Sequence, residues 1–123
     1  MVVNVFYINA EGQLEFGLKE IEGTYYYFSE DGTCEDLSDA SGWKVLEDNW
    51  YYFSNGELKT GWVQSKGLWY YMDPETGVMQ TGWLLLDETY YYLKPGNGDM
   101  ATGWVKVNGL WYLIVEIAKE RNQ

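Results

Sequence analysis

Four Gly-Trp dipeptides recur at nearly even spacing, at Gly42-Trp43, Gly61-Trp62, Gly82-Trp83 and Gly103-Trp104. Seven residues after each of these Trp residues stands a second aromatic residue, at Trp50, Trp69, Tyr90 and Trp111. An interval of about 20 residues is typical of a repeat array, in which each unit buries its apolar face against its neighbour. Flat rings at fixed intervals also indicate a surface that binds cations or sugars by stacking.

The whole chain, residues 1–123, is interpreted as one repeat module. Clear repeats run over residues 42–112 and degenerate repeats over 5–41. An acidic insertion over residues 35–39 lengthens one interval, and we expect it to be a solvated surface loop. The atypical tail, residues 113–123, lacks the glycine loop of the other units. Its pattern fits either a cap strand or a short helix.

Within one repeat the pattern reads strand, turn, strand, loop. Residues 61–64 and 68–72 are rich in aromatic and β-branched side chains, which indicates strands joined by a turn at Ser65-Lys66-Gly67. Asn108-Gly109 is the strongest turn signal, because Asn-Gly accepts the positive φ angles of a type I′ turn. Isolated hairpins are barely stable in water, so they must stack. The predicted fold is therefore all-β, an elongated solenoid of stacked β-hairpins.

Composition excludes several classes of function. The net charge is −11 with only eight scattered basic residues, which argues against nucleic acid as a partner. A lone Cys34 and the absence of His leave no nucleophile–base pair, so we expect no enzymatic activity. No pattern predicts a metal site or a cofactor. The longest apolar stretch, residues 110–115, is too short to span a bilayer, and membrane insertion is not expected.

The alternation of side chains along a strand predicts how the rings are arranged. Trp69 and Tyr71 share one face of their strand and Tyr70 takes the other. The Trp of a Gly-Trp dipeptide and the first ring of the next cluster then lie side by side, while the middle Tyr of the following unit points back at them. Three such faces suit a quaternary ammonium. The remaining rings are predicted to be core: Phe28, Tyr52, Phe53, Tyr71 and Tyr92.

One stretch carries a recognisable motif, which reads Gly61-Trp62, Gly67, Trp69-Tyr70-Tyr71, Gly77, Met79 and Thr81-Gly82-Trp83. It resembles the choline-binding repeats of Gram-positive cell-wall proteins and lysins, with one extra residue before Gly77. The resemblance is clear from Gly42 to Tyr112 and weaker from Val5. It implies a non-catalytic module that binds choline on the teichoic acids of the bacterial wall. We expect the chain to belong to a larger exported protein at the cell surface, where a homodimer through terminal repeats is one available assembly.

The resemblance also implies three aromatic cages, each closed by an apolar residue. The first comprises Trp43, Trp50 and Tyr70 with Leu58, and the second Trp62, Trp69 and Tyr91 with Met79. The third comprises Trp83, Tyr90 and Tyr112 with Met100. No working cage is expected around Leu18, Tyr25 and Tyr51, where a Leu replaces the Trp.

A second function remains open. Repeats that bind carbohydrate in glucan-binding proteins and clostridial toxins share the Gly-Trp and Tyr-Tyr-Phe features, and Gly23 to Phe28 resembles them. Those repeats often carry a polar residue in place of the first aromatic of the cluster. Because Trp50, Trp69 and Trp111 keep the aromatic, the pattern favours choline. A purely structural spacer with degenerate sites is the third alternative.

Overall fold

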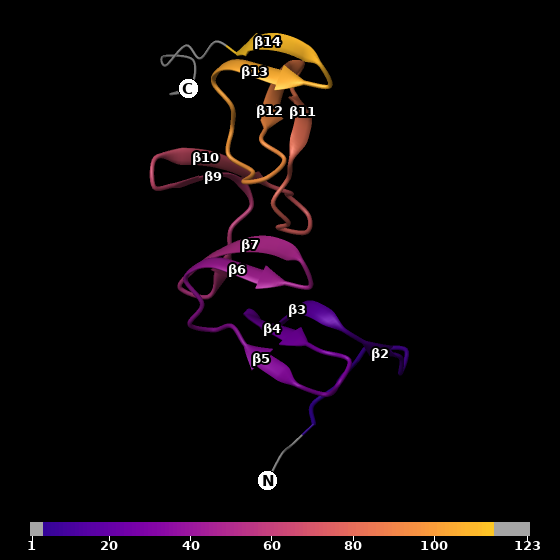
Figure 1. Ribbon diagram of the computed structural model, residues 1–123. Helices are drawn as coiled ribbons and strands as arrows, with labels where there is room; N and C mark the ends of the chain where they lie inside the picture. Colours follow the sequence, from indigo (N-terminus) through magenta and orange to yellow (C-terminus); the bar gives the residue numbers. More distant parts are fainter. Residues whose placement is uncertain (1–3, 115–123) are drawn as a thin grey trace. The chain divides into compact units, whose positions relative to one another are not determined.

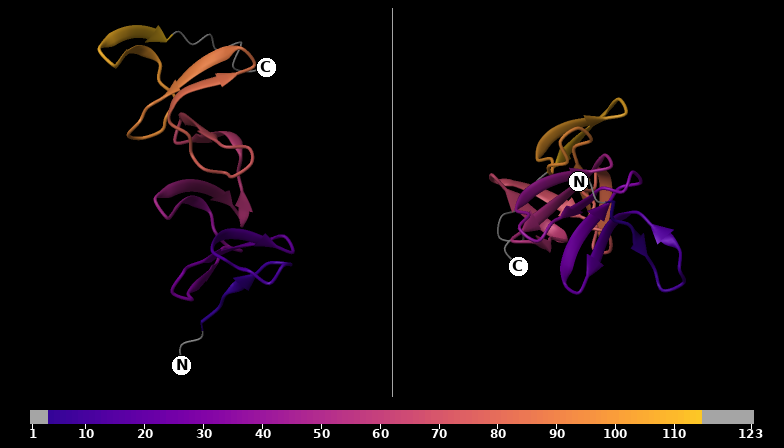
Figure 2. Two further views of the ribbon diagram at one scale, coloured as in Figure 1. Left: turned by 90° about the vertical axis from the view of Figure 1, so that its right-hand side faces the viewer. Right: turned by 90° about the horizontal axis from the view of Figure 1, so that it is seen from below.

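The computed structural model describes residues 4–114, and their regular structure is entirely antiparallel β-hairpins and short bridges (Figure 1). The other views also show paired strands joined by short loops (Figure 2). The described residues form no helix. The described residues divide into two compact units, each considered by itself. The first comprises residues up to 63 together with 72–79, and the second comprises 64–71 together with residues from 80 onward.

In the first unit, the N-terminal pair is β1 (Tyr7–Ile8) with β2 (Leu14–Glu15). Two three-stranded sheets follow. One has the order β3 (Gly17–Ile21), β4 (Thr24–Phe28), β5 (Cys34–Asp36), and the other β6 (Gly42–Leu46), β7 (Asn49–Ser54), β8 (Glu57–Leu58). In both sheets the first two strands are the hairpin predicted from the repeat. The third strand is the segment that follows the hairpin.

The next hairpin, β9 (Gly61–Ser65) with β10 (Leu68–Met72), contributes residues to both units. Its bounds confirm the two predicted strands, except that Ser65, which was predicted to lie in the turn, is the last residue of β9, so the turn is Lys66-Gly67. The second unit continues with two further hairpins, β11 (Gly82–Leu86) with β12 (Thr89–Leu93) and β13 (Gly103–Val107) with β14 (Leu110–Ile114). The tail enters β14 through Leu113 and Ile114, and the rest of it lies outside the described residues.

The hairpin turns share one backbone geometry. Asn108 and Gly109 have φ angles of 51° and 83°, as a type I′ turn requires, which confirms the strongest turn signal in the sequence. The same positive pair occurs at Asp87 and Glu88, with φ of 48° and 66°, although neither residue is glycine. A side chain in this left-handed region costs about 1 kcal/mol, because Cβ approaches the following carbonyl oxygen. The turn between β11 and β12 is therefore strained.

Relief of this strain gives a testable result. We expect Glu88→Gly to raise the free energy of unfolding by about 0.5–1 kcal/mol, after allowing for the greater freedom of glycine in the unfolded chain. Glu88→Gln is the matched control, because it removes the same charge and keeps the strain. Urea denaturation measures both variants. An equal shift in the two midpoints would show that charge, and not backbone conformation, is responsible.

The core of the first unit gathers around Phe53. Leu37, Leu46, Tyr51 and Phe53 form a buried cluster, with Leu18, Tyr25 and Leu58 among the residues packed against it. Leu37 lies inside the acidic insertion that the sequence predicted to be a solvated loop, and that prediction was wrong in part. Glu35 and Asp36 are exposed but continue strand β5, while the next residue, Leu37, turns into the core. Its amide donates a hydrogen bond of 2.9 Å to the carbonyl oxygen of Tyr25.

The core of the second unit includes Tyr92, Leu93 and Ala101, together with a buried carboxylate at Asp99. Burial by itself would raise the pKa of Asp99, but a hydrogen bond from Asn97 (2.9 Å) and the nearby Lys94 ammonium (3.4 Å) outweigh it and lower the pKa. Rings predicted as core are buried at Phe28, Phe53, Tyr71 and Tyr92, while Tyr52 is half-buried.

Candidate aromatic cages

Strand register places the predicted cage rings of a hairpin on one face. In β11–β12, Trp83 pairs with Tyr92 and Leu85 pairs with Tyr90, so these four side chains share a face. The same register holds in β6–β7, where Trp43 pairs with Tyr52 and Val45 with Trp50. The Gly-Trp ring and the first ring of the cluster are therefore neighbours on the hairpin, as the alternation of side chains predicts.

The three rings of the third predicted cage come together in the second unit. The Trp83 ring lies 5.2 Å from that of Tyr112, with 71° between their planes, and 6.4 Å from that of Tyr90, at 90°. Trp83, Tyr90 and Tyr112 are 43%, 64% and 36% exposed, so all three remain open to solvent. Tyr92 packs beneath Trp83 at 4.9 Å and is buried, which fixes the indole from below. The result is a set of steeply inclined aromatic walls around one indole.

Tyr112 reaches this group because it lies on the opposite face of its hairpin from Trp104 and Trp111. In β13–β14, Trp104 pairs with Leu113 and Lys106 with Trp111, whereas Val105 pairs with Tyr112. The two Trp rings are 67% and 63% exposed, and the Lys106 ammonium lies 5.7 Å from the centre of the Trp111 ring. A cation therefore already contacts the first cluster ring of the last described hairpin.

Part of the first predicted cage is present in the first unit. The rings of Trp43 and Trp50 are 6.0 Å apart at 79°, and Tyr52 supports Trp43 at 5.0 Å. Tyr70, the predicted third wall, is a buried residue of the second unit. In the second predicted cage, Trp62 belongs to the first unit, whereas Trp69 and Tyr91 belong to the second. These two complete triads therefore remain predictions.

Met79 and Met100, two of the apolar residues assigned to close the cages, each pair with their own hairpin through the bridges Met72↔Met79 and Leu93↔Met100. Their amides also reach the preceding repeat. The Met79 amide donates to the carbonyl oxygen of Trp50 at 2.9 Å, and the Met100 amide donates to that of Trp69 at 2.7 Å. The backbone of Met79 thus joins that of Trp50, and the backbone of Met100 joins that of Trp69. The loop after a hairpin therefore forms hydrogen bonds with the preceding hairpin. The order of residues in the motif does not predict these bonds.

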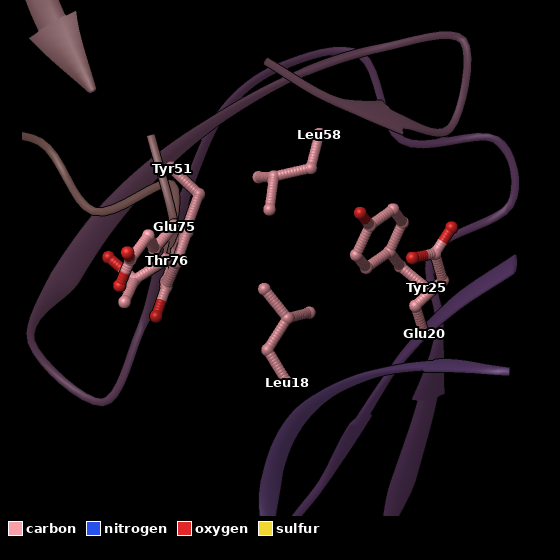
Figure 3. Close-up of a pocket in the computed structure, with 7 residues that line it drawn as sticks. All are labelled: Leu18, Glu20, Tyr25, Tyr51, Leu58, Glu75 and Thr76. Atoms are coloured by element: carbon pink, nitrogen blue, oxygen red, sulfur yellow. The ribbon is translucent and has the colours of Figure 1, made fainter. Parts of the chain in front are cut away.

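Leu58 lines a pocket that the sequence did not predict. The pocket occupies about 400 Å³ in the first unit and is lined by Leu18, Glu20, Tyr25, Tyr51, Leu58, Glu75 and Thr76 (Figure 3). Leu18, Tyr25 and Tyr51 are the residues around which no working cage was expected. Strand alternation could have revealed Glu20, because it stands two residues after Leu18 on the same strand face.

Matches to known families cover most of these repeats. Residues 59–102 match a family described as a choline-binding repeat. Residues 17–34, 41–57 and 102–114 match one described as a putative cell wall binding repeat. Within the part of the chain that the structure describes, no helix is long and apolar enough to cross a membrane.

Solved structures from Streptococcus pneumoniae share both sequence and fold with the chain. Choline binding protein F is 41% identical, with a TM-score of 0.64, over 89% of this chain and 36% of that protein. The choline binding domain of Spr1274 is 30% identical, with a TM-score of 0.54, over 64% of this chain and 92% of that domain. A curated relative is glucosyltransferase-S of Streptococcus downei, 32% identical over 48% of this chain. The match spans 6% of that enzyme. The chain thus corresponds to about a third of choline binding protein F and to a small part of the glucosyltransferase.

Proposed function

Because this chain belongs to the family of choline-binding repeat proteins, we propose that it is a non-catalytic module that holds choline in aromatic cages. The observation that carries the proposal is that the rings of Tyr90 and Tyr112 both lie against that of Trp83 while all three remain exposed to solvent. Of the three predicted triads, this is the one whose rings all lie in a single compact unit.

The physical case rests on the inclination of these rings. The rings of Tyr112 and Tyr90 stand at 71° and 90° to that of Trp83, and the exposed face of an aromatic ring attracts a cation. A contact of this kind contributes about 0.5–2 kcal/mol, depending on how far the cation is desolvated. A trimethylammonium group has no N–H donor, so it loses no hydrogen bond when it is surrounded by aromatic faces. Its methyl groups pack on the rings, and the net charge of −11 adds a general attraction for cations.

The sequence predicts further sites at Trp43, Trp50 and Tyr70 with Leu58, and at Trp62, Trp69 and Tyr91 with Met79. A single cage is expected to bind choline at about 1 mM, equivalent to about −4 kcal/mol. Several cages on one chain gain about 10²–10⁴-fold in avidity when the ligand is a polymer that bears many choline groups. This reasoning favours a choline-decorated teichoic acid of the bacterial wall as the natural ligand.

The cellular setting follows from the same family. Repeats described as cell wall binding, and streptococcal relatives, support a location outside the cell at the bacterial surface. We expect the chain to act within a larger exported protein. The exposed rings of Trp104 and Trp111 support the further expectation of a homodimer through the terminal repeats.

A choline titration followed by Trp fluorescence tests the proposal. We expect a saturable change in the millimolar range that persists at high salt, where the general attraction of the negative charge for cations is screened. Dimethylbutanol, the neutral carbon isostere of choline, is the matched control ligand, because it has the same shape and no charge. It should bind at least about fivefold more weakly, since the cation–π contribution is absent. Equal binding of the two ligands would overturn the cation cage.

Carbohydrate binding is the second candidate, supported by the similarity to glucosyltransferase-S. The cluster Tyr25-Tyr26-Tyr27-Phe28 in the first unit also fits it. An oligosaccharide of glucose added in the same titration separates the two functions. A saturable response to the sugar with none to choline would establish the second candidate in place of the first.

A further inference from the structure

The pocket beside Leu58 has the same framework as the aromatic cages but a different chemistry. Leu18 pairs with Tyr27, as Trp43 pairs with Tyr52, so Leu18 takes the position of the Gly-Trp ring. Glu20 pairs with Tyr25, as Val45 pairs with Trp50 and Leu85 with Tyr90. At this site an indole is therefore lost, and a carboxylate is gained on the same face.

A second carboxylate enters from the loop after β10. Asp73 Oδ1 accepts hydrogen bonds from the amides of Glu75 (2.7 Å) and Thr76 (2.9 Å), and these bonds lower the pKa of Asp73. The loop closes with a bond of 2.8 Å from the Gly77 amide to the Asp73 carbonyl oxygen. Gly77 has φ of +80°, and a Cβ there would lie 2.7 Å from Leu58 Cδ2. Glu75 and Thr76 are thus held at the pocket by a hydrogen-bonded loop packed on Leu58.

Figure 3 shows how these side chains enclose the space. Tyr25 and Glu20 lie on one side, Tyr51, Glu75 and Thr76 on the other, with Leu18 and Leu58 between them. Tyr51 is buried and Tyr25 half-buried, and burial raises the pKa of both hydroxyls, so both rings are neutral at pH 7. Among the described residues that line the pocket there is no Lys or Arg. The lining therefore combines apolar surface with two negative charges that no lining cation neutralises.

We propose that this pocket binds an unbranched primary alkylammonium, whose stem packs between Tyr25, Tyr51 and the two leucines while its N–H groups donate to the Glu20 carboxylate beside Tyr25. The Glu75 carboxylate on the opposite side adds electrostatic attraction for the cation. Charge-assisted hydrogen bonds to carboxylates are stronger than neutral ones and need a donor. A primary ammonium supplies three donors, whereas choline supplies none from its nitrogen. A volume of about 400 Å³ lies within the range of small-ligand pockets.

The test uses the whole chain with pentylamine as the ligand, followed through the NMR resonances of the Tyr25 and Tyr51 rings. We expect saturable shifts at these rings with pentylamine. Choline at concentrations that saturate the Trp83 cage should leave them unchanged. The readout is separate from Trp fluorescence, so failure of this site and failure of the choline cages are distinguishable. Absence of ring shifts with pentylamine, or equal shifts with choline, would overturn the proposal.

Matched variants then test the carboxylate. Glu20→Gln should weaken pentylamine binding about tenfold, since a charge-assisted hydrogen bond is lost. Glu22→Gln makes the same charge change in the turn of the same hairpin, outside the pocket, and should leave the affinity within about twofold. Equal weakening by both variants would show a general charge effect and overturn the role of Glu20.

A variant that gains choline binding distinguishes a specific loss of pentylamine binding from a failure to fold. The double variant Leu18→Trp with Glu20→Val restores the residue types found at Trp43 and Val45. It should lose pentylamine binding and add one choline site, seen as an increase in the choline bound per chain by calorimetry. Retention of pentylamine binding by this variant would overturn the assignment.

Discussion

Phe53→Ala is expected to lower the free energy of unfolding of the first unit by about 3–5 kcal/mol, the usual cost of removing a fully buried aromatic ring. Phe53 is 1% exposed and stands at the centre of the cluster formed with Leu37, Leu46 and Tyr51. Its ring also meets that of Tyr25 edge-on, with 5.9 Å between centroids. The deletion would leave a cavity bounded by several strands and by Leu37, and these cannot close in together.

Urea denaturation followed by tyrosine and tryptophan fluorescence measures the loss. Phe16→Ala in the same unit is the matched control, because Phe16 is exposed and the same truncation there should cost about 0.5 kcal/mol or less. Phe53→Leu should cost clearly less than Phe53→Ala, since most of the volume is retained. A similar small effect of the alanine change at both positions would contradict the placement of the core.

Most of the architecture could be predicted from the sequence, because the same hairpin pattern occurs in several successive repeats. The Gly-Trp spacing, the aromatic clusters and Asn108-Gly109 all point to hairpins, and the strands and turn confirm them. Leu37 shows where such reasoning fails. Two of its neighbours in the insertion are acidic and exposed, so local polarity predicted a solvated loop. Burial of Leu37 depends on Leu46 and Phe53, which are distant in sequence.

The candidate sites were predictable only in part, for a related reason. Side-chain alternation predicts that Trp83 and Tyr90 share one face of their hairpin, because it is a property of single strands and their register. The approach of Tyr112 to Trp83 joins two hairpins and does not follow from register alone. The positions of Met79 and Met100 depend on hydrogen bonds to Trp50 and Trp69, which join separate repeats. The local sequence around each methionine does not predict which earlier hairpin its loop will contact. The pocket at Glu20 and Glu75 escaped prediction for the same reason.

Trp83→Ala is expected to remove choline binding at the third cage, with a loss of affinity of at least tenfold. Trp83 contacts Tyr90, Tyr92 and Tyr112, so its removal deletes one cation–π wall and the support that keeps the other two inclined toward the ligand. Losing one such contact of about 0.5–2 kcal/mol accounts for about 2–30-fold, and the loosened rings add to it. Trp83→Phe keeps a ring and should bind choline at an intermediate level.

The measurement follows the NMR resonances of the Tyr90 and Tyr112 rings during a choline titration, because other Trp residues would mask the change in fluorescence. Trp104→Ala is the matched control: its ring is 67% exposed, and its hairpin presents Tyr112 on the opposite face. It should leave the affinity at Tyr112 within about twofold, as expected of a surface change away from the site. If Trp83→Ala left the choline shifts at Tyr112 intact, the ligand would have to be held by other residues. If Trp104→Ala abolished them equally, the effect would arise from loss of the β13–β14 hairpin, and binding at Trp83 would lose its support.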